Sequence, residues 1–294
     1  SRLIVAIDAE EQLAPIARHL LALAAALWFA TSYSAGFSAV RPEVYALSTL
    51  LVVATLVLLV RGLVDEDEAA LRRAALLGGL ALTNHHLLAA AAAVPGFYVM
   101  VQSRRRFAAA ALAVCLALGV YGYLPLRASR HPVVNWGAPT TISRVVWTVS
   151  ASAFQKSVKR GATTETSELV GAITYEANIL GVVGATFGFW VLARRKRWAV
   201  AALIGTSSGL TILATAIVGF DWANPDAYGY LASSLALLAA LAVLPIAAAL
   251  RSRRVAIVAA CGVLALSGLF VLKLPRFDLS TRRETDAVAA WLDS

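Results

Sequence analysis

Residues 44–60 read VYALSTLLVVATLVLLV, a run without a charged side chain. An α-helix needs ~20 predominantly apolar residues to cross the hydrocarbon core of a bilayer, so this run is long enough for most of a crossing. Similar apolar segments occur at 16–35, 75–102, 107–126, 177–193, 198–219, 228–249 and 255–273 of the 294-residue chain. The sequence therefore predicts an all-α fold, a polytopic transmembrane helical bundle.

The composition excludes an ordinary soluble enzyme. Charged residues make up 15% of the chain, whereas soluble domains carry roughly 25%, and the mean hydropathy is +0.73. The formal net charge of +9 comes from 26 basic and 17 acidic residues. The basic residues stand in short clusters between apolar segments, where membrane topology places them, so we expect no nucleic-acid partner. We expect a multi-pass protein of the cell (inner) membrane, with the lipid bilayer as its surroundings.

The basic clusters also predict a break in one segment. Clusters at 104–106, 194–197 and 251–254 favour the cytoplasmic side, and so do Arg72 and Arg73. One crossing cannot begin and end on the same side, so we expect 75–102 to form two short helices that break near residues 83–86, with the turn toward the outer face. A break at Pro95 and Gly96 is the alternative. Counted this way, the chain makes about nine crossings.

This topology places four pieces on the outer face: 36–43, 127–176, 220–227 and the tail from Leu274. After Pro139, either Thr140 or Thr141 can cap an amphipathic helix that begins at Ile142. Such a helix tends to lie on the membrane surface. We expect one transmembrane domain over 1–273, with 274–294 as the start of an extracytoplasmic C-terminal region.

Polar side chains at the rims of the apolar segments are candidates for function, because they are costly there. Asn84, His85 and His86 are the most conspicuous. Adjacent helical residues point about 100° apart, so the two histidines do not form a metal pair and we expect no metal between them. Hydrogen bonds between helices and contacts with a phosphate or a sugar remain the two interpretations. Glu43 is either ordinary helix-start chemistry or a functional acid.

Two further segments combine charge with aromatic residues. The outer loop 221–226 (DWANPD) carries two acids, Asp221 and Asp226, which could hold a divalent cation or accept a proton. No other cofactor is expected. The segment 123–139 carries Arg127 and His131, suited to a phosphate, and then Asn135 and Trp136, whose indole suits the apolar face of a sugar. Contact of these cations with anionic lipid is the alternative.

Three stretches resemble one family. Residues 41–47 (RPEVYAL) look like its A-E-V-Y-A-L string, 82–86 (LTNHH) are similar to its G-N-H-H, and 124–127 (LPLR) with 135–139 (NWGAP) are similar to its L-P-I-R and N-W-G-D-P. A weaker likeness covers 226–230. The family is that of the DUF2723 membrane proteins, grouped with the protein O-mannosyltransferases of the GT-C superfamily.

The resemblance implies a GT-C-like bundle that transfers a sugar from a polyprenyl-phosphate donor to a hydroxyl of a protein or glycan acceptor at the outer membrane face. It implies phosphate and sugar contacts from Asn84, His85, His86, Arg127, His131, Asn135 and Trp136, with Glu43 and Asp226 as supporting catalytic acids. A carrier or flippase for lipid-linked sugars, or a non-catalytic membrane subunit, is the alternative from another class.

The sequence departs from the family at two points. Ala138 stands where N-W-G-D-P has its acid, and no segment matches the acid-bearing first outer loop of the family. The chain begins at Ser1, and Met100 is its only methionine. We therefore expect the chain to lack an N-terminal part of the transferase and to be inactive without it.

Overall fold

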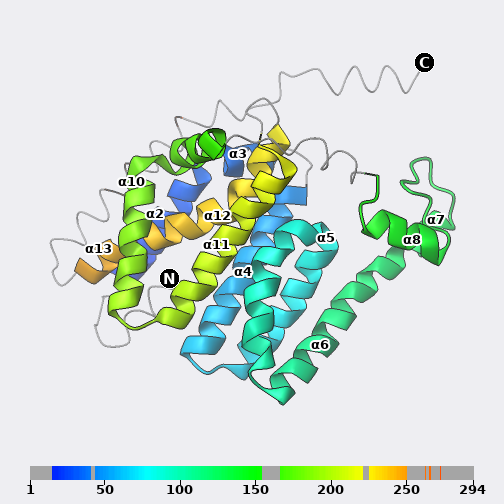
Figure 1. Ribbon diagram of the computed structural model, residues 1–294, viewed down its shortest axis with the longest axis horizontal. Helices are drawn as coiled ribbons and strands as arrows, with labels where there is room; N and C mark the ends of the chain where they lie inside the picture. Colours follow the sequence, from blue (N-terminus) through cyan, green and yellow to red (C-terminus); the bar gives the residue numbers. More distant parts are fainter. Residues whose placement is uncertain are drawn as a thin grey trace.

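A computed structural model describes residues 15–40, 44–153, 166–220 and 225–249, together with residues 262, 265 and 272. In these ranges every regular element is a helix (Figure 1). Six helices form most of a candidate membrane span: α4 (Val44–Val64), α5 (Glu68–Val101), α6 (Arg104–Leu118), α10 (Thr166–Arg194), α11 (Trp198–Val218) and α12 (Pro225–Ala242). The other helical elements are α2 (Pro15–Ala30), α3 (Tyr33–Val40), η1 (Gly119–Gly122), α7 (Tyr123–Ala128), α8 (Ile142–Val149) and α13 (Leu244–Ala249).

Six helical stretches in these ranges are long and apolar enough to cross a membrane, and the bent pair α2–α3 can form a seventh crossing. The predicted all-α, multi-pass bundle is confirmed. Six of the predicted segments coincide with these stretches. The last predicted segment, 255–273, lies outside the described residues apart from positions 262, 265 and 272, and the predicted C-terminal region 274–294 lies wholly outside them.

The first predicted segment, 16–35, is not one helix. The chain bends by 73° between α2 and α3. Thr31 Oγ1 donates to the carbonyl of Trp28 at the end of α2, and Ser32 Oγ accepts from the backbone N–H of Ala35 in the first turn of α3. The Thr31 hydroxyl thus adds a second hydrogen bond to the Trp28 carbonyl, which also accepts from the N–H of Thr31 at 3.1 Å, and the Ser32 hydroxyl caps the start of α3. Most of the predicted outer piece 36–43 is therefore helical.

Helix α5 folds back on itself, as the basic clusters predict. His85 has φ −155° and ψ 91°, which is extended backbone within an otherwise helical stretch. Arg106, near the start of α6, forms an ion pair of 2.6 Å with Glu68, the first residue of α5. The chain that follows the end of α5 therefore lies close to the beginning of α5. Figure 1 shows the two limbs side by side. The predicted break near residues 83–86 is confirmed, and the alternative at Pro95 is wrong because Pro95 lies inside the second limb.

The bundle has two distinct ends. The connections at residues 65–67, 102–103 and 195–197 lie together at the lower end of Figure 1, which we call the basic end. Asp67 caps α5 there by accepting from the N–H of Ala70 at 2.9 Å, and Arg61 holds Asp67 at 2.7 Å. The opposite end carries His85, and we call it the break end. One end of the bundle therefore carries charged loop residues, and the opposite end carries the break in α5.

Helix α10 also has two limbs, which meet at Asn178 with φ 50° and ψ 168°. Asparagine tolerates positive φ, and its Oδ1 accepts from the N–H groups of Leu180 and Gly181 at 2.9 and 3.1 Å. The second limb corresponds to the predicted segment 177–193. The first limb, from Thr166, was not predicted as a helix and takes up the end of the expected outer stretch 127–176.

Helix α6 leads away from the bundle and carries an arm made of η1, α7 and α8 (Figure 1). The predicted amphipathic helix is present as α8. Thr141 is its N-cap and accepts from the N–H of Arg144 at 3.3 Å. Ile142 and Val146 lie one turn apart and are 85% and 60% exposed. This exposed apolar face suits a position on a membrane surface.

Candidate functional site

The break in α5 is stabilised by the residues that the sequence singles out. His85 is the N-cap of the second limb, and its Nδ1 accepts from the N–H of Leu88 at 3.4 Å. A neutral imidazole that accepts at Nδ1 carries its proton on Nε2. Asn84 Nδ2 donates to the carbonyl of Val44 at 3.0 Å, which ties the break to the first residue of α4. The polar string therefore shapes the turn and leaves one imidazole N–H as a donor.

Aromatic rings from three helices surround His85. Its ring centroid lies 5.8 Å from that of Tyr45 on α4 and 5.4 Å from that of Tyr230 on α12. The Tyr45 and Tyr230 centroids are 5.4 Å apart, and His86 lies 6.3 Å from His85. These separations are those of interacting rings. We call Tyr45, His85, His86 and Tyr230 the break-end cluster.

Gly229 explains how α12 reaches this cluster. A Cβ atom at Gly229 would lie 2.5 Å from Cδ2 and 2.7 Å from Cδ1 of Tyr45, which is closer than carbon atoms approach. Only glycine lets the backbone of α12 pass over the Tyr45 ring. The cluster therefore depends on a close approach between two helices far apart in the sequence.

Glu176 is a polar residue of the break end that sequence reasoning missed. It is 7% exposed, and its Oε2 accepts from the backbone N–H of Ser34 at 3.1 Å. The contact joins the first limb of α10 to the start of α3. Its only signal in the sequence is an acid two residues before Asn178, in a stretch assigned to an outer loop. Nearby, the Tyr33 ring centroid lies 4.7 Å from that of Tyr228.

The other predicted site residues lie on the arm or outside the description. Arg127 is exposed in the last turn of α7, His131 follows with φ 48°, and Trp136 is 60% exposed between α7 and α8, just after Asn135. Figure 1 shows this arm standing apart from the break in α5. Glu43 lies outside the described residues, and Asp226 lies in the first turn of α12 with its side chain undescribed.

One hydrogen bond ties the base of the arm to the break. The hydroxyl of Tyr121, in η1, donates to the carbonyl of Leu82 at 3.1 Å. The structure thus brings Asn84, His85 and His86 together with aromatic residues that were not among the candidate site residues, and it carries the cations and the indole on a tethered arm. Within the described ranges, His, Cys, Asp and Glu form no group of three or more that could hold a metal ion.

A known protein family matches the part of the chain that contains the break in α5. Residues 2–119 match the family model of the protein O-mannosyl-transferase TMEM260 N-terminal domain. The matched stretch includes α2 to α6, and with them Tyr45, Asn84, His85 and His86. It ends before Arg127 and the rest of the arm. The chain is thus similar to a protein O-mannosyltransferase over this stretch, which supports a membrane glycosyltransferase. No curated protein and no solved structure matches the chain.

Proposed function

We propose that the chain is the membrane part of a GT-C glycosyltransferase of the DUF2723 kind. It moves a sugar, as an O-mannosyltransferase does, from a polyprenyl-phosphate donor to a hydroxyl of a protein or glycan acceptor at the outer face of the cell (inner) membrane. The family similarity over residues 2–119 supports the reaction class. The basic loops at the end opposite His85 support the outer placement of the break end, because cytoplasmic loops carry excess Arg and Lys.

The main observation in support of the proposal is the break in α5 at His85. A non-helical residue within a membrane-spanning helix is tolerated where protein or a wet cavity surrounds it. Here the break exposes His86 and leaves His85 half-buried among Tyr45 and Tyr230. A lipid-linked donor keeps its phosphate at headgroup level, so a donor group at this end is suitably placed for it.

The proposed chemistry divides the candidate residues into two sets. The acceptor hydroxyl loses its proton to a carboxylate, Glu43 or Asp226, while its oxygen forms a bond to the anomeric carbon of the sugar. The bond from that carbon to the phosphate oxygen breaks, and polyprenyl phosphate leaves. Arg127, His131 and the Nε2–H of His85 stabilise the leaving phosphate.

The remaining candidates position the sugar. Trp136 offers an indole face to its apolar side. Asn84, His86 and Asn135 supply polar contacts to the sugar or the phosphate. The arm on which Trp136 lies must approach the break end for the two sets to act together, and the hydrogen bond from Tyr121 to Leu82 fixes its base there.

A polar stripe on α11 bears on the alternative, a carrier for lipid-linked sugars. Ser207, Thr211 and Thr215 are buried at four-residue intervals. Each hydroxyl donates to a carbonyl one turn earlier in its own helix, at 2.8 to 3.0 Å. Hydroxyls used in this way offer little to a sugar crossing the bilayer. This observation favours transfer at one end over transport along the bundle.

A transfer assay tests the proposal. The chain, reconstituted in vesicles, is given polyprenyl-phosphate mannose and a serine-containing acceptor peptide. We expect His85→Ala and Arg127→Ala to lower the transfer rate by at least ~10²-fold, the scale of a lost oxyanion-type donor. Arg194→Ala, an exposed arginine at the basic end, is the matched control and should leave the rate unchanged. Chelation with EDTA tests the divalent cation.

Two outcomes would overturn it. Wild-type rates in both site variants would remove the proposed donors from the reaction. Movement of labelled sugar-lipid across the vesicle membrane without any transfer would favour the carrier.

A further inference from the structure

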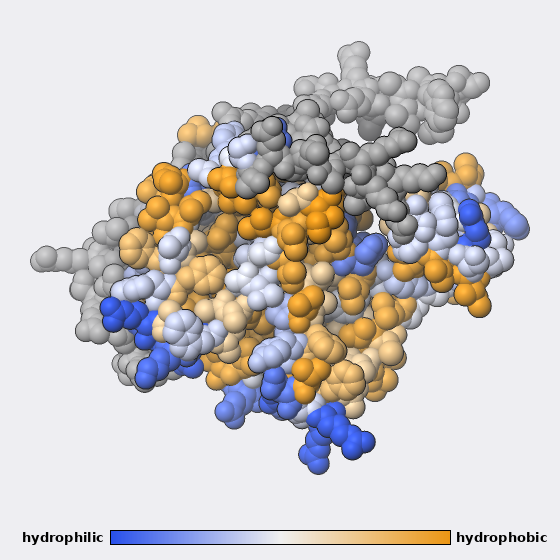
Figure 2. Space-filling model, in the orientation of Figure 1, coloured by the Kyte–Doolittle hydropathy of each residue, from blue (hydrophilic) through white to orange (hydrophobic). Residues whose placement is uncertain are grey.

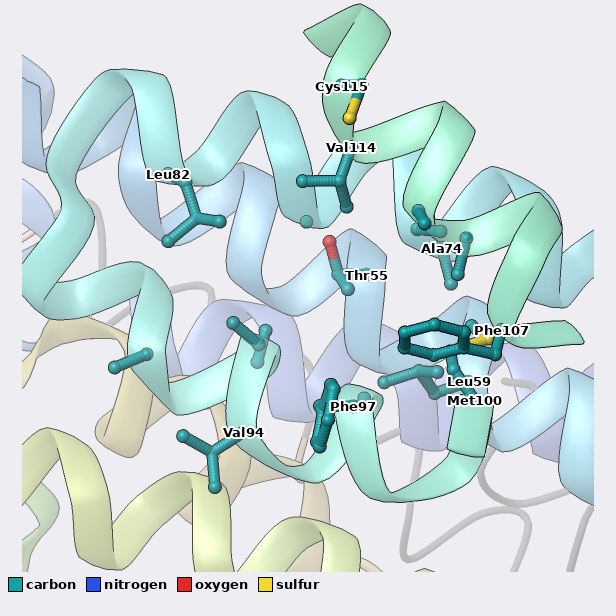
Figure 3. A pocket seen from close by; sticks show the side chains of 18 residues that line it. Thr55, Leu59, Ala74, Leu82, Val94, Phe97, Met100, Phe107, Val114 and Cys115 are labelled. Atoms are coloured by element: carbon teal, nitrogen blue, oxygen red, sulfur yellow. The ribbon is translucent and has the colours of Figure 1, made fainter. Parts of the chain in front are cut away.

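A large apolar groove lies between α4, the two limbs of α5 and α6 (Figure 3). Its volume is about 600 Å³, within the range of about 300–1,000 Å³ that is usual for ligand pockets. Thr55 supplies the one hydroxyl in its wall, and that hydroxyl donates to the carbonyl of Leu51 at 2.7 Å. The groove therefore offers hydrocarbon surface and suits an alkyl chain.

The groove is accessible from the side where lipid would lie. Five of its lining residues are exposed, among them Val94 (51%), Phe97 (62%) and Phe107 (46%); the other two are Ala111 and Cys115. The rings of Phe97 and Phe107 meet edge to face with centroids 6.3 Å apart. Figure 3 shows Phe107 beside Met100 and Leu59, at the end of the groove away from Leu82. An alkyl chain can thus enter sideways, near the basic end.

Several arginines of the basic end directly or shortly precede residues that line the groove. Arg61 and Arg106 are paired with Asp67 and Glu68. Four others are exposed and form no ion pair within the part of the chain that the structure describes: Arg72, Arg73, Arg104 and Arg105. The first two directly precede Ala74 and Ala75, and the second two shortly precede Phe107, all of which line the groove. Figure 2 shows hydrophilic residues at this lower end.

We propose that the groove binds an anionic glycerophospholipid of the leaflet at the basic end. One acyl chain fills the space between the limbs of α5 and α6, and the headgroup phosphate lies against the arginines of 72–73 and 104–105. Guanidinium groups bind phosphate through paired hydrogen bonds, and basic pockets between membrane helices select anionic headgroups. The site is distinct from the break-end cluster, and it does not rest on the proposed function.

Native mass spectrometry of the full chain, titrated with phosphatidylglycerol or phosphatidylcholine, tests the site. We expect one phosphatidylglycerol to be retained, with a Kd on the order of tenfold below that for phosphatidylcholine. The double variant Arg104→Gln/Arg105→Gln changes only exposed side chains, so it should fold and lose this preference.

A second pair of variants tests the groove itself. A Cβ atom at Gly78 would meet nothing nearer than Thr55 Cγ2 at 3.6 Å, so Gly78→Leu should fold and fill the groove. It should weaken the binding of both lipids by at least ~10-fold, the loss expected when several buried CH₂ groups are displaced. Gly209→Leu is the matched control, because its Cβ would meet nothing within 4 Å.

Four results would overturn the proposal, and the last is evidence for a second copy in the groove. The first is equal binding of the two lipids by the wild-type chain, and the second is binding of phosphatidylglycerol that neither set of variants changes. The third is displacement of phosphatidylglycerol by polyprenyl phosphate, which would assign the groove to the tail of the donor. A dimer that Gly78→Leu dissociates would assign it to a second copy.

Discussion

The substitution Gly229→Ala tests how the break-end cluster is held together. The new Cβ would lie 2.5 and 2.7 Å from two ring atoms of Tyr45, whereas carbon atoms pack at about 3.5–4.0 Å. The ring, or α12, must therefore move by roughly 1 Å. Tyr45 is only 9% exposed and lies against His85 and Tyr230, so it has little room to move.

Two quantities should change. Overpacking of this kind costs about 1–3 kcal/mol of unfolding free energy, which thermal unfolding in detergent can measure. If the cluster positions the donor phosphate, a displacement of this size should also lower the transfer rate by on the order of 10²-fold. Gly209→Ala is the control, since its Cβ would meet nothing within 4 Å and alanine is the better helix former.

A double-mutant cycle sharpens the test. In a Tyr45→Ala background the obstructing ring is absent, so Gly229→Ala should lose most of its cost in stability. The reasoning is refuted if Gly229→Ala matches the wild type in both stability and transfer rate, or if its cost is undiminished when Tyr45 is removed.

Three further predictions concern the scaffold. Gly188→Ala would place a Cβ 2.9 Å from the carbonyl carbon of Leu241, so we expect it to lower the free energy of unfolding by about 1–3 kcal/mol. An unchanged melting temperature would contradict the close packing of α10 on the backbone at Leu241. Glu176→Gln keeps an acceptor for the N–H of Ser34 at the start of α3, whereas Glu176→Ala leaves that buried N–H without its acceptor at a cost of about 1–3 kcal/mol. The glutamine variant should therefore unfold at a higher temperature than the alanine variant. Equal melting temperatures would contradict the proposed role of this hydrogen bond. The hydrogen bond from the N–H of Ala70 is the main cause that holds the pKa of Asp67 below its ordinary 3.8. The charged carboxylate therefore stabilises the folded state above pH 3.8, and this stabilisation is lost as the pH falls through the folded-state pKa. The difference in melting temperature between the wild type and Asp67→Asn should therefore narrow below pH 3.8, and a constant difference would refute it.

Much of the architecture could be predicted from the sequence, because local pattern and charge determine it. Apolar length marks the crossings, and the break in α5 follows from arginines that flank one segment on both sides. The start of α8 follows from a threonine cap before an amphipathic run. These features depend on residues within one or two helical turns, or on a membrane that sorts charge along the whole chain.

The contacts between helices could not be predicted. Nothing local to Tyr45 indicates that it packs against Gly229, because that contact joins α4 to α12. The bend after Thr31 and the burial of Glu176 depend on each other, since the carboxylate reaches the helix that starts at the bend. Of the candidate site residues, those in α5 could be placed with the helix, whereas the position of Arg127 and Trp136 depends on how far the arm leans from the bundle.

The length of the second limb of α5 has a consequence for the surrounding lipid. At 1.5 Å per residue the limb from His86 to Val101 spans about 24 Å, while the hydrocarbon core is about 30 Å thick. A span that is too short thins the bilayer around it or lets water and headgroups sink toward its end. The membrane should therefore dip over His85, so that a phosphate carried on a lipid meets the protein below the plane of the neighbouring headgroups.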